Sequence, residues 1–275
     1  MLLSTSASRT NLLQARAEKA VVGQVCTTAY QALMVQQQRL NDELAKAVQY
    51  VQALLPPRQT GCIETDWIFR PSAELGGDAF GYHWLDDEHF ALYLFDVTDH
   101  GIGSALHSVS VLNVLRNQAL RGVDFRQPGA VLAALNDAFP MKQYNNLYFT
   151  IWYGVFNRKT RQLTYATGGH PPALLVNHTP EGLEAEQLRT QGLLIGGVPE
   201  VTYPVASRIL PAGSTLYLFS DGVYEVKRED GSMLDLDAFL DMLVGQVHEN
   251  SDVLQPLMDQ IDAIRNCTIC DDDAA

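Results

Sequence analysis

The clearest pattern in the chain is an apolar repeat that alternates steps of four and three residues. It runs through Cys26, Tyr30, Leu33, Gln37, Leu40, Leu44, Ala47, Val51 and Leu54. This spacing is typical of the seam of a coiled coil, in which a polar residue such as Gln37 sets register or oligomeric state. Pro56 and Pro57 end the pattern, because proline breaks a helix. We predict a helical linker or coiled coil over 21–55, preceded by a flexible segment over 1–20.

The role of this helix has two interpretations. It either packs as a single amphipathic helix on its own domain, or it dimerises and signals through residues 26–54. Four heptads without a helix breaker favour the second interpretation. We therefore expect a homodimer through this segment, or a link to an upstream sensor or receiver domain.

After the prolines, short apolar or alternating runs are separated by Asn, Gly and Pro. Such runs predict strands over 62–70, 90–97, 147–156, 162–167, 173–176, 201–209 and 214–219. A helical period predicts helices over 103–120, 128–139, 236–246 and 253–264. Because strands neighbour strands and helices are grouped, the order favours an α+β fold over a parallel βαβ sheet.

Composition narrows the class of protein. With 275 residues, 47% of them hydrophobic and 19% charged, the chain is globular, with one catalytic-sized domain over 56–275 and an appendage. A net charge of −13 repels a phosphate backbone, so no nucleic-acid partner is expected, whereas the same carboxylates suit hard divalent cations. The sequence shows no secretory signal and no apolar run of 18 residues, so we expect a cytoplasmic protein without a membrane partner.

Candidate chemistry lies in aspartates at strand ends and tight turns. Asp78 follows two glycines, Asp96 closes the apolar run FALYLF, Asp221 closes LYLFS, and residues 271–273 are all aspartate. A single such residue is usually a turn former. Carboxylates brought together repel each other, which either raises their pKa values or demands a cation. With oxygen ligands alone, that cation is Mg²⁺ or Mn²⁺ rather than zinc.

Six motifs in order resemble the metal-dependent PPM/PP2C-type serine/threonine phosphatases, in the bacterial SpoIIE/RsbU-like branch. They are LLP at 54–56, PSAELGGDAFGYHWL, DVTDHGIGSAL, GGHPPALL at 168–175, FSDGVYEV at 219–226 and the terminal CDDD. The resemblance implies a four-layer α/β/β/α sandwich of two antiparallel sheets flanked by helices, preceded by the coiled-coil-like helix.

The resemblance also implies a metal centre with two divalent cations, Mn²⁺ or Mg²⁺, that activate water. The implied ligands are Asp78, Asp96, Asp221, Asp272 and the carbonyl of Val97, with Asp96 bridging both ions and with Asp273 and Asp99 as further candidates. Gly101 and Gly103 open the helix after Asp96, where they either let free N–H groups meet a phosphate or relieve a tight turn. His170 either orders its proline-rich turn or contacts substrate, and His100 either assists proton transfer or is a surface residue.

The chain departs from the family pattern at two places. Asp99 stands where the family has glycine. A glycine there permits a turn with positive φ, and Asp tolerates that conformation better than most residues do. Asp99 therefore either keeps the turn and adds a carboxylate for a third metal, or it misplaces Asp96. The chain also stops at Ala275, so the closing C-terminal strand of the family is apparently truncated.

The resemblance implies a protein serine/threonine phosphatase that is the output domain of a bacterial signalling pathway. Its substrate would be phosphoserine or phosphothreonine on a regulatory protein, of the STAS or anti-sigma-antagonist type. The alternative is a catalytically weak or degenerate domain that serves as a partner-binding module. A coiled-coil scaffold with an incidental acidic domain is a third interpretation, but it does not explain the ordered motifs.

Overall fold

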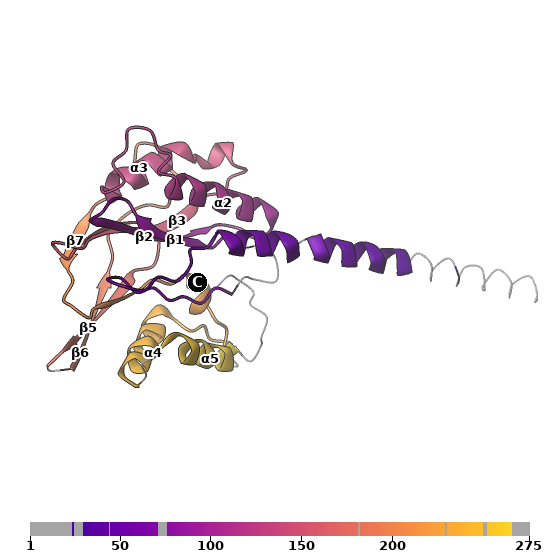
Figure 1. Ribbon diagram of the computed structural model, residues 1–275. Coiled ribbons are helices and arrows are strands. Elements are labelled where there is room, and N and C mark those ends of the chain that lie inside the picture. Colours follow the sequence, from indigo (N-terminus) through magenta and orange to yellow (C-terminus); the bar gives the residue numbers. More distant parts are fainter. Residues whose placement is uncertain are drawn as a thin grey trace, which may run out of the picture. The chain divides into compact units, whose positions relative to one another are not determined.

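The computed structural model describes residues 24, 30–43, 45–70, 76–180, 182–228, 230–249 and 252–265. The chain divides into two compact units, Met1–Tyr50 and Val51–Ala275. In the first unit, residues 30–43 and 45–50 are helical (indigo in Figure 1), as the apolar repeat predicts. Its seam residues Tyr30, Leu33 and Leu40 are 63%, 60% and 54% exposed, whereas Cys26 and Leu44 lie outside the described residues.

The second unit contains two sheets whose strand pairs are all antiparallel. The larger sheet has the order β1 (Ala79–Trp84), β2 (His89–Val97), β3 (Phe149–Asn157), β4 (Gln162–Gly168) and β7 (Ala206–Ile209). The smaller sheet has the order β6 (Gly182–Leu188), β5 (Ala173–Thr179) and β8 (Thr215–Tyr217). Side-chain alternation along these strands decides which residues face helices and which face the other sheet.

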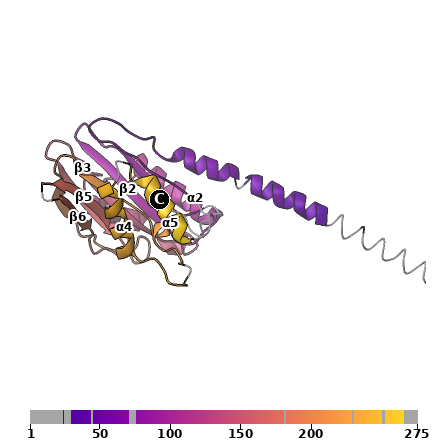
Figure 2. The same ribbon diagram turned by 90° about the horizontal axis from the view of Figure 1, so that it is seen from below.

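Helices cover the outer face of each sheet. They are α2 (Ile102–Arg116), α3 (Pro128–Ala138), α4 (Leu236–Glu249) and α5 (Leu254–Arg265), with short 3-10 turns η1 (Met141–Gln143) and η2 (Asp221–Val223). Figure 1 shows α2 and α3 on one side of the stacked sheets and α4 and α5 on the other, and Figure 2 shows α4 and α5 from below. The fold is therefore the expected four-layer α/β/β/α sandwich. Within the described parts of the chain, every helix is too short or too polar to cross a bilayer.

Each interface between layers has its own apolar cluster. Residues such as Phe95, Leu112 and Tyr153 fill the space between the larger sheet and its helices. Trp152, with Leu163 and Leu175, fills the layer between the two sheets. A further cluster that includes Ile261 lies under α4 and α5. Full burial of each large apolar side chain stabilises the fold by about 1.5–3 kcal/mol.

The strand predicted over 62–70 is wrong. The structure has no strand there and only a bridge residue at Arg70. The apolar side chains of this segment pack without backbone pairing: the Trp67 and Phe80 ring centroids are 5.3 Å apart, and the Arg58 guanidinium lies 4.7 Å from the Trp67 ring centroid. The segment is only partly buried, with Cys62 exposed, and its partial packing beside an edge strand does not require a strand.

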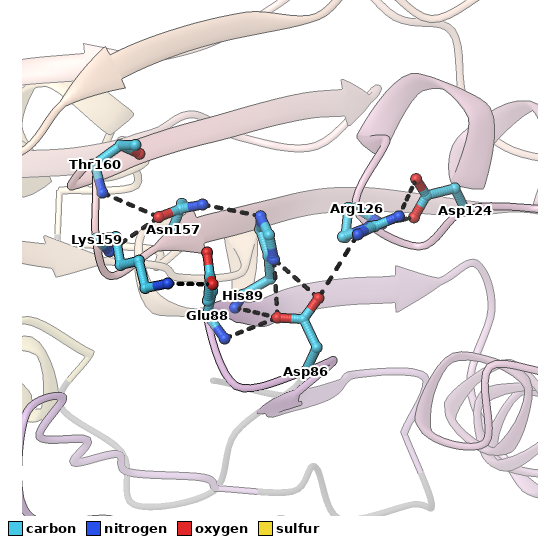
Figure 3. A network of polar contacts seen from close by, with 8 residues as sticks. All are labelled: Asp86, Glu88, His89, Asp124, Arg126, Asn157, Lys159 and Thr160. Carbon is cyan, nitrogen blue, oxygen red and sulfur yellow. Dashed lines mark hydrogen bonds and ion pairs between the residues drawn. The ribbon is translucent and has the colours of Figure 1, made fainter.

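A polar network holds together the end of the larger sheet where β2 begins and β3 ends (Figure 3). The Asn157 Oδ1 accepts hydrogen bonds from the backbone N–H groups of Lys159 and Thr160, so its amide nitrogen faces His89 Nε2 at 3.0 Å. His89 Nε2 therefore accepts a hydrogen bond, and Nδ1 carries the proton that faces the Asp86 carboxylate at 2.9 Å. Backbone N–H bonds to the Asp86 carboxylate and the neighbouring His89 lower the pKa of Asp86 to about 2.

Candidate metal centre

Two of the predicted ligands come from neighbouring strands at one end of the larger sheet. The register pairs Ala79 with Phe95, and the Val97 N–H donates to the Gly77 carbonyl at 3.3 Å, so the pairing continues past Asp78 and places it opposite Asp96. Phe95 faces α2 and α3, and therefore Asp96 faces the layer between the sheets. Both carboxylates thus lie on the inner face, with Asp78 2% exposed and Asp96 half-buried.

The backbone beside these aspartates is packed too closely for any residue but glycine at position 77. A Cβ on Gly77 would lie 2.1 Å from the carbonyl oxygen of Val97. The hydroxyl of Ser108, from α2, donates to the Gly77 carbonyl. Val97 is therefore in contact with the residue before Asp78, and the Asp78 and Asp96 segments are held together by backbone contact.

The turn after β2 places a residue other than glycine at positive φ. Asp99 has φ 71°, and its Oδ1 accepts a hydrogen bond from the His100 N–H at 2.9 Å. Thr98 anchors the turn to Tyr148 through two hydrogen bonds of 3.0 Å to the Tyr148 carbonyl. Asp99 therefore adopts the positive-φ turn, and a role of its carboxylate toward a third metal stays a prediction.

The two glycines predicted to lie near a phosphate differ in whether the backbone requires a glycine at that position. Gly101 has φ 92° and precedes α2, whose N-terminus has no side-chain cap and no acidic residue in its first turn. A Cβ on Gly103 would meet nothing within 4 Å. Only Gly101 is thus required by the backbone, and α2 presents uncapped N–H groups directly after the turn that follows Asp96.

Asp221 comes from the other sheet. It begins η2, it is half-buried, and Ser220 before it is fully buried. The pairing of Leu174 with Tyr217 places the end of β8 beside the start of β5, and the His170 turn leads into β5. Asp221 therefore lies at the end of the smaller sheet that adjoins the His170 turn.

His170 connects the two sheets near these aspartates. Its Nδ1 lies 2.9 Å from the hydroxyl of Thr150, and Thr150 is the β3 partner of Asp96. Burial lowers the pKa of His170 to about 3, against a smaller opposing effect of the Phe219 backbone. The ring is therefore neutral at physiological pH and is suited to fixing the turn.

The predicted ligand set is only partly brought together. Asp78, Asp96 and Val97 are adjacent, and Asp221 stands on the second sheet, whereas Asp272 and Asp273 lie outside the described residues. Among the residues that the structure describes, no three His, Cys, Asp or Glu side chains form a cluster that could hold a metal ion. The oxygen donors at this site come from the carboxylates of Asp78 and Asp96 and from the backbone at Val97. Such donors fit a hard divalent cation such as Mg²⁺ or Mn²⁺.

Three residues that contact or pair with the segments of the candidate ligands could not be found from the sequence. Thr150 could not be predicted to lie beside Asp96, because their pairing depends on the register of β2 and β3. Ser108 lies on α2, where only the helical period places it one turn from Ser104. Arg265 donates to the Gly222 carbonyl at 3.1 Å, a contact between segments distant in sequence that no local pattern predicts.

Comparison with solved structures identifies the class of fold. The SiaA-PP2C domain of Pseudomonas aeruginosa superposes with a TM-score of 0.70 at 19% identity, covering 86% of this chain and 95% of that domain. The PP2C phosphatase domain of SpoIIE from Bacillus subtilis gives a TM-score of 0.59 at 18% identity, covering 75% of this chain and 59% of that one. The chain has the fold of a PP2C phosphatase domain.

Sequence comparison identifies the family. The profile described as Stage II sporulation protein E (SpoIIE) matches residues 86–275, so the chain belongs to the SpoIIE family. Phosphoserine phosphatase RsbU of Bacillus subtilis (strain 168) is 27% identical over 205 residues, which are 74% of this chain and 59% of that protein. Phosphoserine phosphatase RsbP of the same organism is 28% identical over 193 residues, 66% of this chain and 45% of that protein. The chain thus spans about half the length of these relatives.

Proposed function

We propose that this chain is a metal-dependent protein phosphatase that hydrolyses phosphoserine or phosphothreonine on a regulatory protein. The observation that carries the proposal is the pairing of Asp78 with Asp96 on the inner face of the larger sheet, with Val97 packed against Gly77. Membership of the SpoIIE family and the names of the RsbU and RsbP relatives support the same chemistry.

Carboxylates and a backbone carbonyl would hold the cations. We assign this role to Asp78, Asp96, Val97, Asp221 and Asp272, with Asp273 and Asp99 as additional candidates. When bound, two divalent cations of this kind activate water and offset the negative charge of the phosphoryl oxygens. The like charges of Asp78 and Asp96 repel without a cation, and this repulsion favours ion binding.

The remaining residues bind the phosphate and fix the ligands. The N–H groups at the start of α2, after Gly101, have no side-chain cap and can donate hydrogen bonds to an anion. Neutral His170 keeps Thr150 in place beside Asp96 through its 2.9 Å hydrogen bond. His170 thus acts by ordering the site. The residue is only 8% exposed, which argues against direct contact with a protein substrate.

The partners follow from the same reasoning. The substrate class that the resemblance implies is a STAS-type antagonist of an anti-sigma factor. Exposed seam residues such as Leu33 and Leu40 support a homodimer through residues 26–54. An upstream sensor or receiver domain and a cytoplasmic location stay predictions.

A degenerate, partner-binding domain is the second candidate function. The substitution of glycine by Asp99 is the observation that favours it. Because Asp99 nevertheless adopts φ 71° and keeps the turn, an active site is the better supported of the two.

Release of phosphate from peptides tests the proposal. With Mn²⁺ present, the full chain should release phosphate from phosphoserine and phosphothreonine peptides, and EDTA should stop the reaction. A phosphotyrosine peptide of the same sequence serves as the control for substrate class. Capture of a phosphorylated partner without phosphate release at any Mn²⁺ concentration would favour the binding module.

A further inference from the structure

We propose that the last turn of α5 positions the candidate metal centre, with Arg265 as a positioning residue for the turn that carries Asp221 and with Asp262 as a positioning residue that acts through Arg70. This inference rests on the proposed function. It assigns a role to two polar contacts that neither the sequence motifs nor the family resemblance addresses.

Arg265 anchors the turn that presents Asp221. Its guanidinium donates to the carbonyl of Gly222, the residue after Asp221, at 3.1 Å. Within η2, hydrogen bonds such as that from the Tyr224 N–H to the Asp221 carbonyl at 2.9 Å close the turn on itself. The contact from Arg265 ties this turn to a helix more than forty residues further along the chain.

Asp262 binds Arg70, which precedes Asp78 by eight residues in the sequence. Its carboxylate forms an ion pair with Arg70 at 2.5 Å, and the two side chains are only 32% and 28% exposed. The surface pair Arg208 and Glu186 is more exposed, at 49% and 43%, so solvent screens it more strongly. Asp262 and Arg265 are three residues apart, and they therefore project from the same side of α5.

The position of α5 itself does not depend on these two contacts. Leu257, Met258 and Ile261 are 5%, 8% and 0% exposed and fix the helix in the apolar cluster under the smaller sheet. The apolar side of the helix is thus packed in the core, and its polar side carries the contacts to Gly222 and Arg70. Residues that orient metal ligands typically change metal affinity by about 10- to 100-fold when they are replaced.

Isothermal titration calorimetry of the full chain with Mn²⁺ tests the inference without relying on phosphatase activity. Arg265→Gln should weaken Mn²⁺ binding by about tenfold. Arg265→Lys keeps a cationic donor and should recover most of the affinity. Arg208→Gln removes a surface ion pair elsewhere and should bind Mn²⁺ as the wild type does, with melting temperatures recorded for all variants.

The outcomes distinguish the proposed metal-dependent function from the positioning role of α5. If the wild type does not bind Mn²⁺, the proposed metal-dependent function fails. If the wild type binds and Arg265→Gln binds equally well, the positioning role is wrong. Should Arg265→Gln unfold, Asp262→Asn provides the second test, with an expected loss of about tenfold in affinity at a melting temperature close to that of Arg208→Gln. Unchanged affinity in Asp262→Asn would overturn the inference.

Discussion

Two residues show how backbone conformation, rather than side-chain chemistry, constrains the site. Gly77 is required because its bare Cα lies against the Val97 carbonyl. Asp99 shows the opposite case, since a non-glycine residue adopts φ 71° and stabilises the turn through the His100 N–H. In this chain position 99 therefore accommodates a Cβ, whereas position 77 lacks room for one.

Gly77→Ala should separate the Asp78 segment from Val97. A Cβ at 2.1 Å from a backbone oxygen forces the backbone to shift, and we expect a loss of about 1–3 kcal/mol in the free energy of unfolding together with weaker Mn²⁺ binding. Urea denaturation and calorimetry measure both effects.

Gly245→Ala is the matched control for this substitution. It lies in α4 with nothing within 4 Å of a new Cβ, and it should stabilise the protein by about 0.5–1 kcal/mol through helix propensity. Unchanged stability and Mn²⁺ affinity in Gly77→Ala would contradict the close packing described above.

At the scale of elements, sequence periodicity predicted the helices and the central strands well. Strands β2 and β3 are nearly continuous apolar runs because they are covered on both faces, and such runs are conspicuous. Strand β6, with the sequence GLEAEQL, lies at a sheet edge, and it was not predicted because Glu184, Glu186 and Gln187 interrupt the apolar residues. Contacts that depend on register or on α5, such as Thr150 with Asp96, could not be predicted from one sequence.

The polar network at the far end of the larger sheet should affect stability alone. Asn157→Ala removes the hydrogen bonds that hold the β3–β4 turn and His89, and it should cost about 1–3 kcal/mol of stability. Because Asp96 lies at the opposite end of β2, roughly 25 Å away, the Mn²⁺ affinity should not change. Equilibrium unfolding and calorimetry check the two expectations, and a large loss of Mn²⁺ affinity would show that the two ends of the sheet are coupled.

At the scale of the whole molecule, buried histidines make the stability dependent on pH. Burial lowers the pKa values of His83, His107 and His170, that of His170 to about 3. The folded protein therefore holds these rings neutral, while the unfolded chain binds protons near pH 6.5. Their contribution is fully present above about pH 6.5 and is lost as the pH falls toward 3.

Denaturation at pH 7 and pH 5 measures this dependence. His170 alone should account for a loss of about 2 kcal/mol over that interval, since each pH unit below its unfolded pKa costs about 1.4 kcal/mol. His170→Asn keeps a hydrogen-bonding group toward Thr150 and cannot titrate, so its stability should fall less between the two pH values. An equally steep fall in the variant would show that His170 does not contribute.

The most direct test of the central claim compares the wild type with Asp96→Asn during a Mn²⁺ titration. Both proteins are assayed for hydrolysis of p-nitrophenyl phosphate, with circular dichroism and melting temperature recorded to show that each is folded. Asp96→Asn changes charge but little volume at the paired strand ends, and we predict saturable, EDTA-sensitive turnover in the wild type and a loss of at least about 100-fold in the variant. Equal turnover in both proteins, or none in the folded wild type at any Mn²⁺ concentration, would contradict a metal-dependent phosphatase built on Asp78 and Asp96.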